Sequence, residues 1–144
     1  MPNITGPTRG LSISRKNRAL LAAALIAVGP VDSPVRAQVD LTAVRTRAEQ
    51  GDPEALNALG NAFANGQGVP QSMADAIRLY QQAADRGLAA AQFNLGMLYE
   101  LGRGVAPDLA RAFAFYLKAA EQGFAPAQFN VGTMYANGLG AKQV

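Results

Sequence analysis

Few side chains in this sequence could carry catalysis, and each of them has a simpler role. The 144 residues include no cysteine and no histidine. This excludes disulfides and thiol chemistry, and it removes the usual zinc ligand and the commonest general base. The only serine after residue 37 is Ser72, which precedes a helical pattern and fits a helix N-cap. Without histidine, a serine nucleophile needs another base, and Lys118 and Lys142 are the only lysines in that part of the chain.

Carboxylates are the remaining candidates for acid–base chemistry. Asp52 with Glu54, and Glu100 with Asp108, are close enough along the chain to form pairs. All four fall at predicted helix caps or exposed edges, where charged groups are normally solvated. The sequence therefore predicts no catalytic residue, no metal site and no cofactor.

The positive charge of the chain is concentrated in its first 37 residues. This segment carries five basic residues and one acidic residue, whereas residues 38–144 carry eight basic and nine acidic residues. A segment with a balanced charge gives no electrostatic reason to expect binding to nucleic acid or to an anionic membrane.

The same 37 residues follow the order of an export signal. Basic residues come first, residues 19–28 (ALLAAALIAV) are continuously apolar, and Val35-Arg36-Ala37 ends the segment with a site that suits a signal peptidase. Ten apolar residues are too few for a comfortable membrane span. We expect cleavage between Ala37 and Gln38 and a periplasmic or secreted protein that is not attached to a membrane. An uncleaved anchor and an ordinary helix are the alternatives.

Beyond this leader the sequence repeats every 36 residues. Glycines mark the period most clearly, in the series Gly51, Gly87, Gly123 and Gly60, Gly96, Gly132. A fixed period of this length indicates stacked supersecondary units. We expect an all-α solenoid of about two and a half repeats, with a capping helix in residues 38–50 and a repeat domain in 51–144. Its units are 51–86, 87–122 and a partial unit, 123–144.

Each unit contains two helical patterns separated by glycines, and the first of these glycines (Gly66, Gly102 and Gly138) fits a left-handed position at the end of a helix. In the first pattern, mostly small and apolar residues recur at i, i+1, i+4, i+5 and i+8, as in the series Ala91, Gln92, Leu95, Gly96 and Tyr99, which is one face of an α-helix. The second pattern begins near Ser72 or Asp108, both good N-caps. A glycine inside a helix costs about 1 kcal/mol relative to alanine. We therefore expect the glycine inside each first helix to let two helix backbones pack closely.

The second unit resembles a known repeat. It reads AAAQFNLGMLYELGRGV, then an Asp cap, then AFAFYLKAAEQG, and this is similar to the Sel-one-like repeat, a relative of the tetratricopeptide repeat. The resemblance covers residues 51 to about 140. It implies a right-handed α/α solenoid that binds proteins or peptides and assembles complexes, often as an exported bacterial protein. Cysteine-rich bacterial members have been linked to β-lactam compounds, but this chain has no cysteine.

The resemblance also implies where a partner would bind. In tetratricopeptide-like solenoids the first helices line a concave groove that holds peptides. Asparagine can donate to and accept from a peptide backbone, although the same asparagines also suit the repeat itself and its helix caps. Met97 and Leu101 break the polar pattern and predict an apolar contact. The predicted protein-binding residues are Glu54, Asn61, Asn65, Asn94, Met97, Leu101, Asn130, Thr133 and Asn137.

The third unit lacks a second helix, so the core face of its first helix, with Val131 and Tyr135, is expected to lack its usual cover. Further repeats, a partner or a second copy would cover it, and end-to-end self-association is one expectation. The predicted function is a non-catalytic scaffold of the bacterial cell envelope that binds a protein or peptide. Two alternatives stay open: a cell-wall or β-lactam-acting hydrolase, by analogy within the family, and a truncated remnant of a longer repeat protein.

Overall fold

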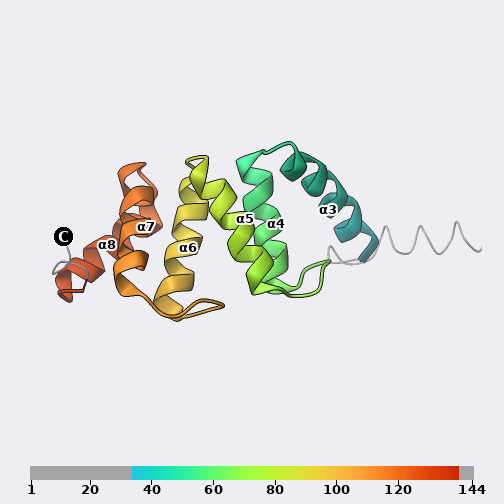
Figure 1. Cartoon of the computed structure of the whole chain (residues 1–144). Coiled ribbons are helices and arrows are strands. Elements are labelled where there is room, and N and C mark those ends of the chain that lie inside the picture. The colour runs from blue at the N-terminus through green and yellow to red at the C-terminus, as the bar shows by residue number, and fades with distance from the viewer. Residues whose placement is uncertain (1–33, 140–144) are drawn as a thin grey trace, which may run out of the picture. The chain divides into compact units, whose positions relative to one another are not determined.

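The described part of the chain consists of α-helices. The computed structural model describes residues 34–139, with side chains from residue 41, and this part holds no β-strand. Residues from Asp40 onward form one compact unit. The predicted all-α repeat fold is confirmed. In chain order the helices are α3 (Pro34–Glu49), α4 (Pro53–Asn65), α5 (Met73–Asp85), α6 (Ala89–Leu101), α7 (Leu109–Glu121) and α8 (Ala125–Ala136) (Figure 1).

Helix α3 corresponds to the predicted capping helix but begins earlier. It starts at Pro34 and runs through the expected cleavage point between Ala37 and Gln38. Its Leu41 and Val44 pack against the core of the first unit, as a capping helix should. Residues 1–33 lie outside the described part of the chain, so the removal of the leader stays a prediction.

Helices α4, α5 and α7 begin at the predicted caps. Asp52 accepts hydrogen bonds from two backbone N–H groups in the first turn of α4. Ser72 accepts one from the backbone N–H of Asp75 and donates its hydroxyl to the Asp75 carboxylate, while Asp108 accepts from the backbone N–H of Arg111. These bonds satisfy donors that the first turn of a helix leaves without a partner. The hydroxyl of Ser72 is thus engaged in capping on both its donor and acceptor sides.

The glycines after the first helices adopt the predicted left-handed conformation. Gly66, Gly102 and Gly138 have φ angles of 67°, 65° and 67°. A side chain strains the backbone in this region, and glycine does not. Gly66 and Gly102 end the first helices of their units and turn the chain toward the second helices, and Gly138 follows Asn137, the C-cap of α8.

The glycines inside the first helices make room for a tyrosine ring. A β carbon on Gly60 would lie 2.7 Å from Cε1 of Tyr80, and one on Gly96 would lie 2.6 Å from Cδ1 of Tyr116. The carbonyl oxygen of Ala76 is farther from the first of these positions, at 3.4 Å. The prediction that two helix backbones pack closely at these glycines is therefore wrong, because an aromatic ring from the second helix occupies the space.

Consecutive helices pack against one another from α4 to α8. One cluster of buried residues lies among α3, α4, α5 and α6, and a second contains residues of α7 and α8. Completely buried alanines occur at the same two positions of both second helices, Ala76 and Ala83 in α5 and Ala112 and Ala119 in α7. Small side chains at these positions allow neighbouring helices to approach closely.

Helix α8 buries one side only. Val131 is buried, but Tyr135, which was expected on the core face, is 51% exposed. Its ring touches Phe113 edge to face at a centroid distance of 5.2 Å. Among the described residues, no heavy atom lies within 4 Å of a β carbon built on Gly132. The place that a tyrosine ring fills in the first two units is open in the third.

Candidate binding site

The predicted protein-binding residues lie on or beside α4, α6 and α8, the first helices of the three units, and we call this surface the first-helix face. Its members differ in exposure. Their role in binding stays a prediction. The exposed members are Glu54, Asn61, Asn65, Leu101, Thr133 and Asn137, and the partly buried members are Asn94, Met97 and Asn130.

The asparagines of the first two units bind one another. The side-chain oxygen of Asn61 accepts a hydrogen bond of 2.7 Å from the hydroxyl of Tyr80. The amide nitrogen of Asn94 donates to the side-chain oxygens of Asn57, at 2.9 Å, and Asn61, at 3.4 Å. The network joins α4 to α5 and to the first helix of the next unit. These side chains therefore hold neighbouring units together.

The equivalent network is altered in the second unit. Met97 stands at the position of Asn61 and packs against the second core cluster, so it is less available to a ligand than expected. The hydroxyl of Tyr116 donates instead to the carboxylate of Glu100. Burial raises the pKa of Tyr116 far above its usual range, Glu100 raises it further, and a side-chain hydrogen bond with Asn130 acts in the opposite direction. The phenol stays protonated and donates at neutral pH.

Three further polar members of the first-helix face lie in the last turn of their helices or just after it. Asn65 is the last residue of α4. The hydroxyl of Thr133 donates to the backbone carbonyl of Phe129 at 3.0 Å, and the backbone N–H of Asn137 donates to the carbonyl of Thr133 at 3.0 Å. The Thr133 bond is the contact with the carbonyl four residues earlier that threonine often makes in helices.

Two large apolar side chains remain exposed on the first-helix face. Leu101 is 63% exposed and Phe129 is 74% exposed. The first unit has Asn65 and Asn57 at the equivalent positions. Leu101 was predicted to belong to the surface and Phe129 was missed. Its equivalent in the second unit, Phe93, packs against Tyr116 and Phe124, so aligning the repeats predicts a covered side chain at position 129 and not an exposed one.

A second repeated feature, which the sequence reasoning missed, is a groove between successive second helices. The α3–α5 groove has a volume of about 350 Å³ and is lined by Arg45, Ala48, Glu49, Leu56, Leu59, Phe63, Arg78, Leu79 and Gln82. The α5–α7 groove has a volume of about 230 Å³ and is lined by Gln81, Tyr99, Arg111, Ala114, Phe115 and Lys118. Five residues that line the α3–α5 groove lie one period, 36 residues, before residues that line the α5–α7 groove. The groove is therefore a feature of the repeat.

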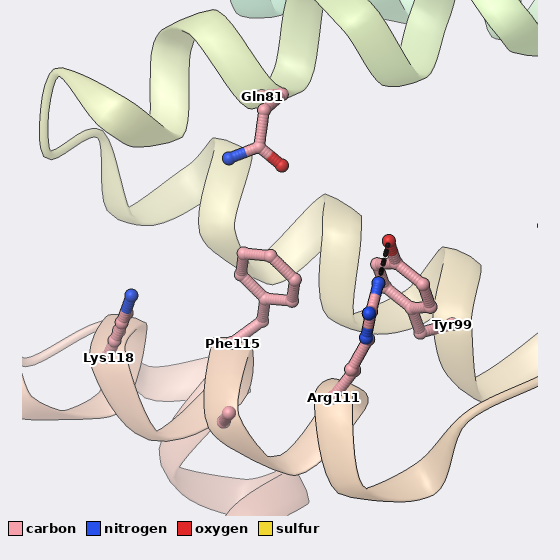
Figure 2. A pocket seen from close by; sticks show the side chains of 6 residues that line it. Gln81, Tyr99, Arg111, Phe115 and Lys118 are labelled. Carbon is pink, nitrogen blue, oxygen red and sulfur yellow. Dashed lines mark hydrogen bonds between the residues drawn. The ribbon is translucent and has the colours of Figure 1, made fainter.

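The α5–α7 groove combines aromatic and cationic side chains. The rings of Tyr99 and Phe115 stack at a centroid distance of 5.8 Å with 10° between their planes. The guanidinium of Arg111 donates to the Tyr99 hydroxyl at 3.2 Å and lies 3.5 Å from the carboxylate of Asp108. Figure 2 shows Phe115 between Arg111 and Lys118, with Gln81 across the groove on α5. This arrangement suits a ligand that has both apolar and acidic groups.

Two features are absent from the described residues. These residues hold no group of three or more acidic side chains that could bind a metal ion. Within the same part of the chain no helix is long and apolar enough to cross a membrane.

Known proteins share this repeat. The family described as Sel1 repeat matches residues 53–88, 89–124 and 125–144. These boundaries lie two residues after the predicted units. No curated protein sequence matches the chain significantly.

Two solved structures have the same fold. The crystal structure of a Sel1 repeat protein from Oxalobacter formigenes is 40% identical, with a TM-score of 0.66 over 70% of this chain and 76% of that one. A protective antigen of uropathogenic Escherichia coli strains, c5321, which displays an SLR fold, is 43% identical, with a TM-score of 0.65. That alignment covers 67% of this chain, which spans about a fifth of the antigen's length (21%). With three matching units over most of its length, the chain belongs to the Sel1 repeat family.

Proposed function

We propose that this protein is a non-catalytic scaffold of the bacterial cell envelope, periplasmic or secreted, and that its first-helix face binds a protein or peptide. The observation that supports this role is the exposure of Leu101 and Phe129, where the first unit carries asparagines. Exposed apolar side chains in a polar setting mark interaction surfaces. Helical repeats offer such surfaces because their units stack side by side.

The hydrogen bonds of the polar side chains favour a scaffold over an enzyme. Ser72 is occupied by its contacts with Asp75. The carboxylate of Glu100 accepts from Tyr116, and Asp52 pairs with Arg47 through a hydrogen bond of 2.7 Å. Ser72, Glu100 and Asp52 thus each have a structural partner.

Photo-crosslinking tests the binding surface. A photoreactive phenylalanine analogue would replace either Leu101 or Phe129 in the full chain, produced in the cells that make it. Both positions should yield the same crosslinked protein. Introducing the residues of the first unit, Leu101→Asn with Phe129→Asn, should abolish crosslinking from a probe placed at Thr133. A matched probe at exposed Ala74, on the second helix α5, should not capture that protein. Equal products from all positions would contradict the proposed surface.

The proposed location rests on the basic and apolar leader, and it has its own test. The mature protein should begin at Gln38, which mass spectrometry of the N-terminal peptide would show. A mature chain that begins at or near Met1 and stays in the cytoplasm would contradict export without affecting the binding surface.

A further inference from the structure

The α5–α7 groove differs from its repeat partner in charge. At the position of Arg111 the first unit has Asp75, and at the position of Lys118 it has Gln82. The α3–α5 groove is lined by two cations and one anion, Arg45, Arg78 and Glu49, whereas both charged residues that line the α5–α7 groove are cations. Two grooves of the same fold thus offer different chemistry.

The two cations are held differently. Arg111 is fixed by Tyr99 and Asp108, and its guanidinium carbon lies 5.5 Å from the centre of the Tyr99 ring. Lys118 is exposed and forms no ion pair with any described residue. The two residues are seven positions apart on α7, which places them on one side of the helix about 10 Å apart at 1.5 Å per residue.

An aromatic surface lies between the cations. Phe115 is partly exposed and stacks on Tyr99, so one face of its ring can accept an apolar group. Across the groove, Gln81 donates its amide to Asp85 at 2.8 Å. This bond leaves its carbonyl oxygen as an acceptor for a backbone N–H.

We propose that the α5–α7 groove binds an extended acidic peptide segment, with one carboxylate at Arg111, a second at Lys118 and an apolar side chain on Phe115. This inference rests on the proposed scaffold role but places a ligand on a different face. In an extended polyproline-type segment, residues three apart lie on the same side at about 9 Å. That spacing is close to the distance of about 10 Å along α7 between Arg111 and Lys118.

The charges determine which peptide binds, and the aromatic contact adds affinity that does not depend on charge. Exposed ion pairs are each worth little in water because salt and solvent screen them. They nevertheless discriminate strongly against a ligand of the wrong sign. Burial of an apolar side chain on Phe115 adds a contribution that salt does not remove.

Fluorescence anisotropy tests the groove with a defined probe. The probe is a labelled, proline-containing peptide with two glutamates three positions apart around a phenylalanine. The comparison peptide carries glutamines in place of the glutamates. The full chain should bind the acidic peptide at least about tenfold more tightly than the neutral one at low salt, and the preference should shrink as salt is added.

The repeat supplies a matched control. Arg111→Gln with Lys118→Gln removes two positive charges from the α5–α7 groove, and Arg45→Gln with Arg78→Gln removes two from the α3–α5 groove. The first variant should lose at least about tenfold in affinity for the acidic peptide, and the second should stay within about twofold of the wild type. Phe115→Leu, which introduces the residue of the first unit, should weaken both peptides. Circular dichroism establishes that each variant is folded.

Three results would overturn the inference: equal binding of the two peptides, no loss in the first variant, or equal losses in both charge variants, which would indicate a general electrostatic effect. Leu101→Asn with Phe129→Asn separates this inference from the proposed scaffold surface. That variant should lose its crosslinked partner and keep the acidic peptide. Retained crosslinking without peptide binding would refute the groove alone.

Discussion

Gly96 lies against the ring of Tyr116 so closely that a β carbon at residue 96 would stand 2.6 Å from two of the ring carbons. Tyr116 is completely buried, and its ring is also 5.4 Å from that of Phe93. It therefore has little freedom to move. The glycine and the tyrosine form one packing unit, which recurs as Gly60 with Tyr80.

We expect Gly96→Ala to destabilise the protein. The added methyl group would gain about 1 kcal/mol in helix propensity, but overpacking of a rigid core costs about 1 to 3 kcal/mol. Since the ring is confined on several sides, the packing cost should exceed the gain. Urea unfolding followed by circular dichroism would measure the difference.

Gly132→Ala is the matched control, because it lies at the same repeat position with no described heavy atom within 4 Å of the new carbon. It should leave the free energy of unfolding unchanged or raise it by up to about 1 kcal/mol. If both substitutions had the same effect, a steric role for the tyrosine ring at Gly96 would be refuted.

The repeat period predicts the local structure of this chain but not the contacts between distant residues. Spacing within one helix was sufficient to predict the helices, their caps at Asp52, Ser72 and Asp108, and the left-handed glycines. The reason for the helix-internal glycines was predicted incorrectly, because the group they accommodate lies 20 residues away on another helix. Periodicity places a residue on a face, but it does not reveal which side chain fills the space opposite.

The same limit applies to the candidate sites: the sequence predicted which face a residue lies on, but not which distant residue it contacts. Asn61 and Asn94 were placed correctly on the face of the first helices. Their mutual hydrogen bond joins residues 33 positions apart, so it could not be predicted from the local sequence pattern. The α5–α7 groove was missed because its walls come from two second helices and its floor from Tyr99 on a first helix. A comparison of charge at equivalent positions, such as Asp75 with Arg111, was the signal available in the sequence.

The hydrogen bond between Asn61 and Tyr80 should stabilise the junction between α4 and α5. Tyr80 is almost fully buried, so Asn61→Ala would leave its hydroxyl without this partner, at a cost of about 1 to 3 kcal/mol. A double-mutant cycle with Tyr80→Phe should give a coupling energy of about 0.5 to 1.5 kcal/mol, because the two side chains are in direct contact.

Asn65→Ala provides the control for this cycle, since Asn65 is exposed at the end of α4. Its effect should add to that of Tyr80→Phe without coupling. Zero coupling between Asn61 and Tyr80 would show that the network does not contribute to stability, and the asparagine would then be better explained as a ligand-facing residue.

Alkaline pH should weaken the fold through Tyr116. Burial and Glu100 raise its pKa in the folded state above the ordinary value of 10.0. As the pH rises past about 10, the unfolded chain therefore loses this proton while the folded chain keeps it, and the free energy of unfolding falls. The contribution is complete below pH 10 and should be smaller by about 1.4 kcal/mol at pH 11.

Tyr116→Phe isolates this contribution. At pH 7 the variant should be less stable by about 1 kcal/mol, because the hydrogen bond to Glu100 is lost. Between pH 10 and 11 its stability should fall less steeply than that of the wild type, so the two curves should converge. Tyr80→Phe should change the slope in the same direction, since burial also raises the pKa of Tyr80. Urea unfolding at several pH values gives both curves. Parallel curves for Tyr116→Phe and the wild type would mean that the Tyr116 phenol ionises equally easily in the folded and unfolded chains, and would refute the raised pKa of Tyr116.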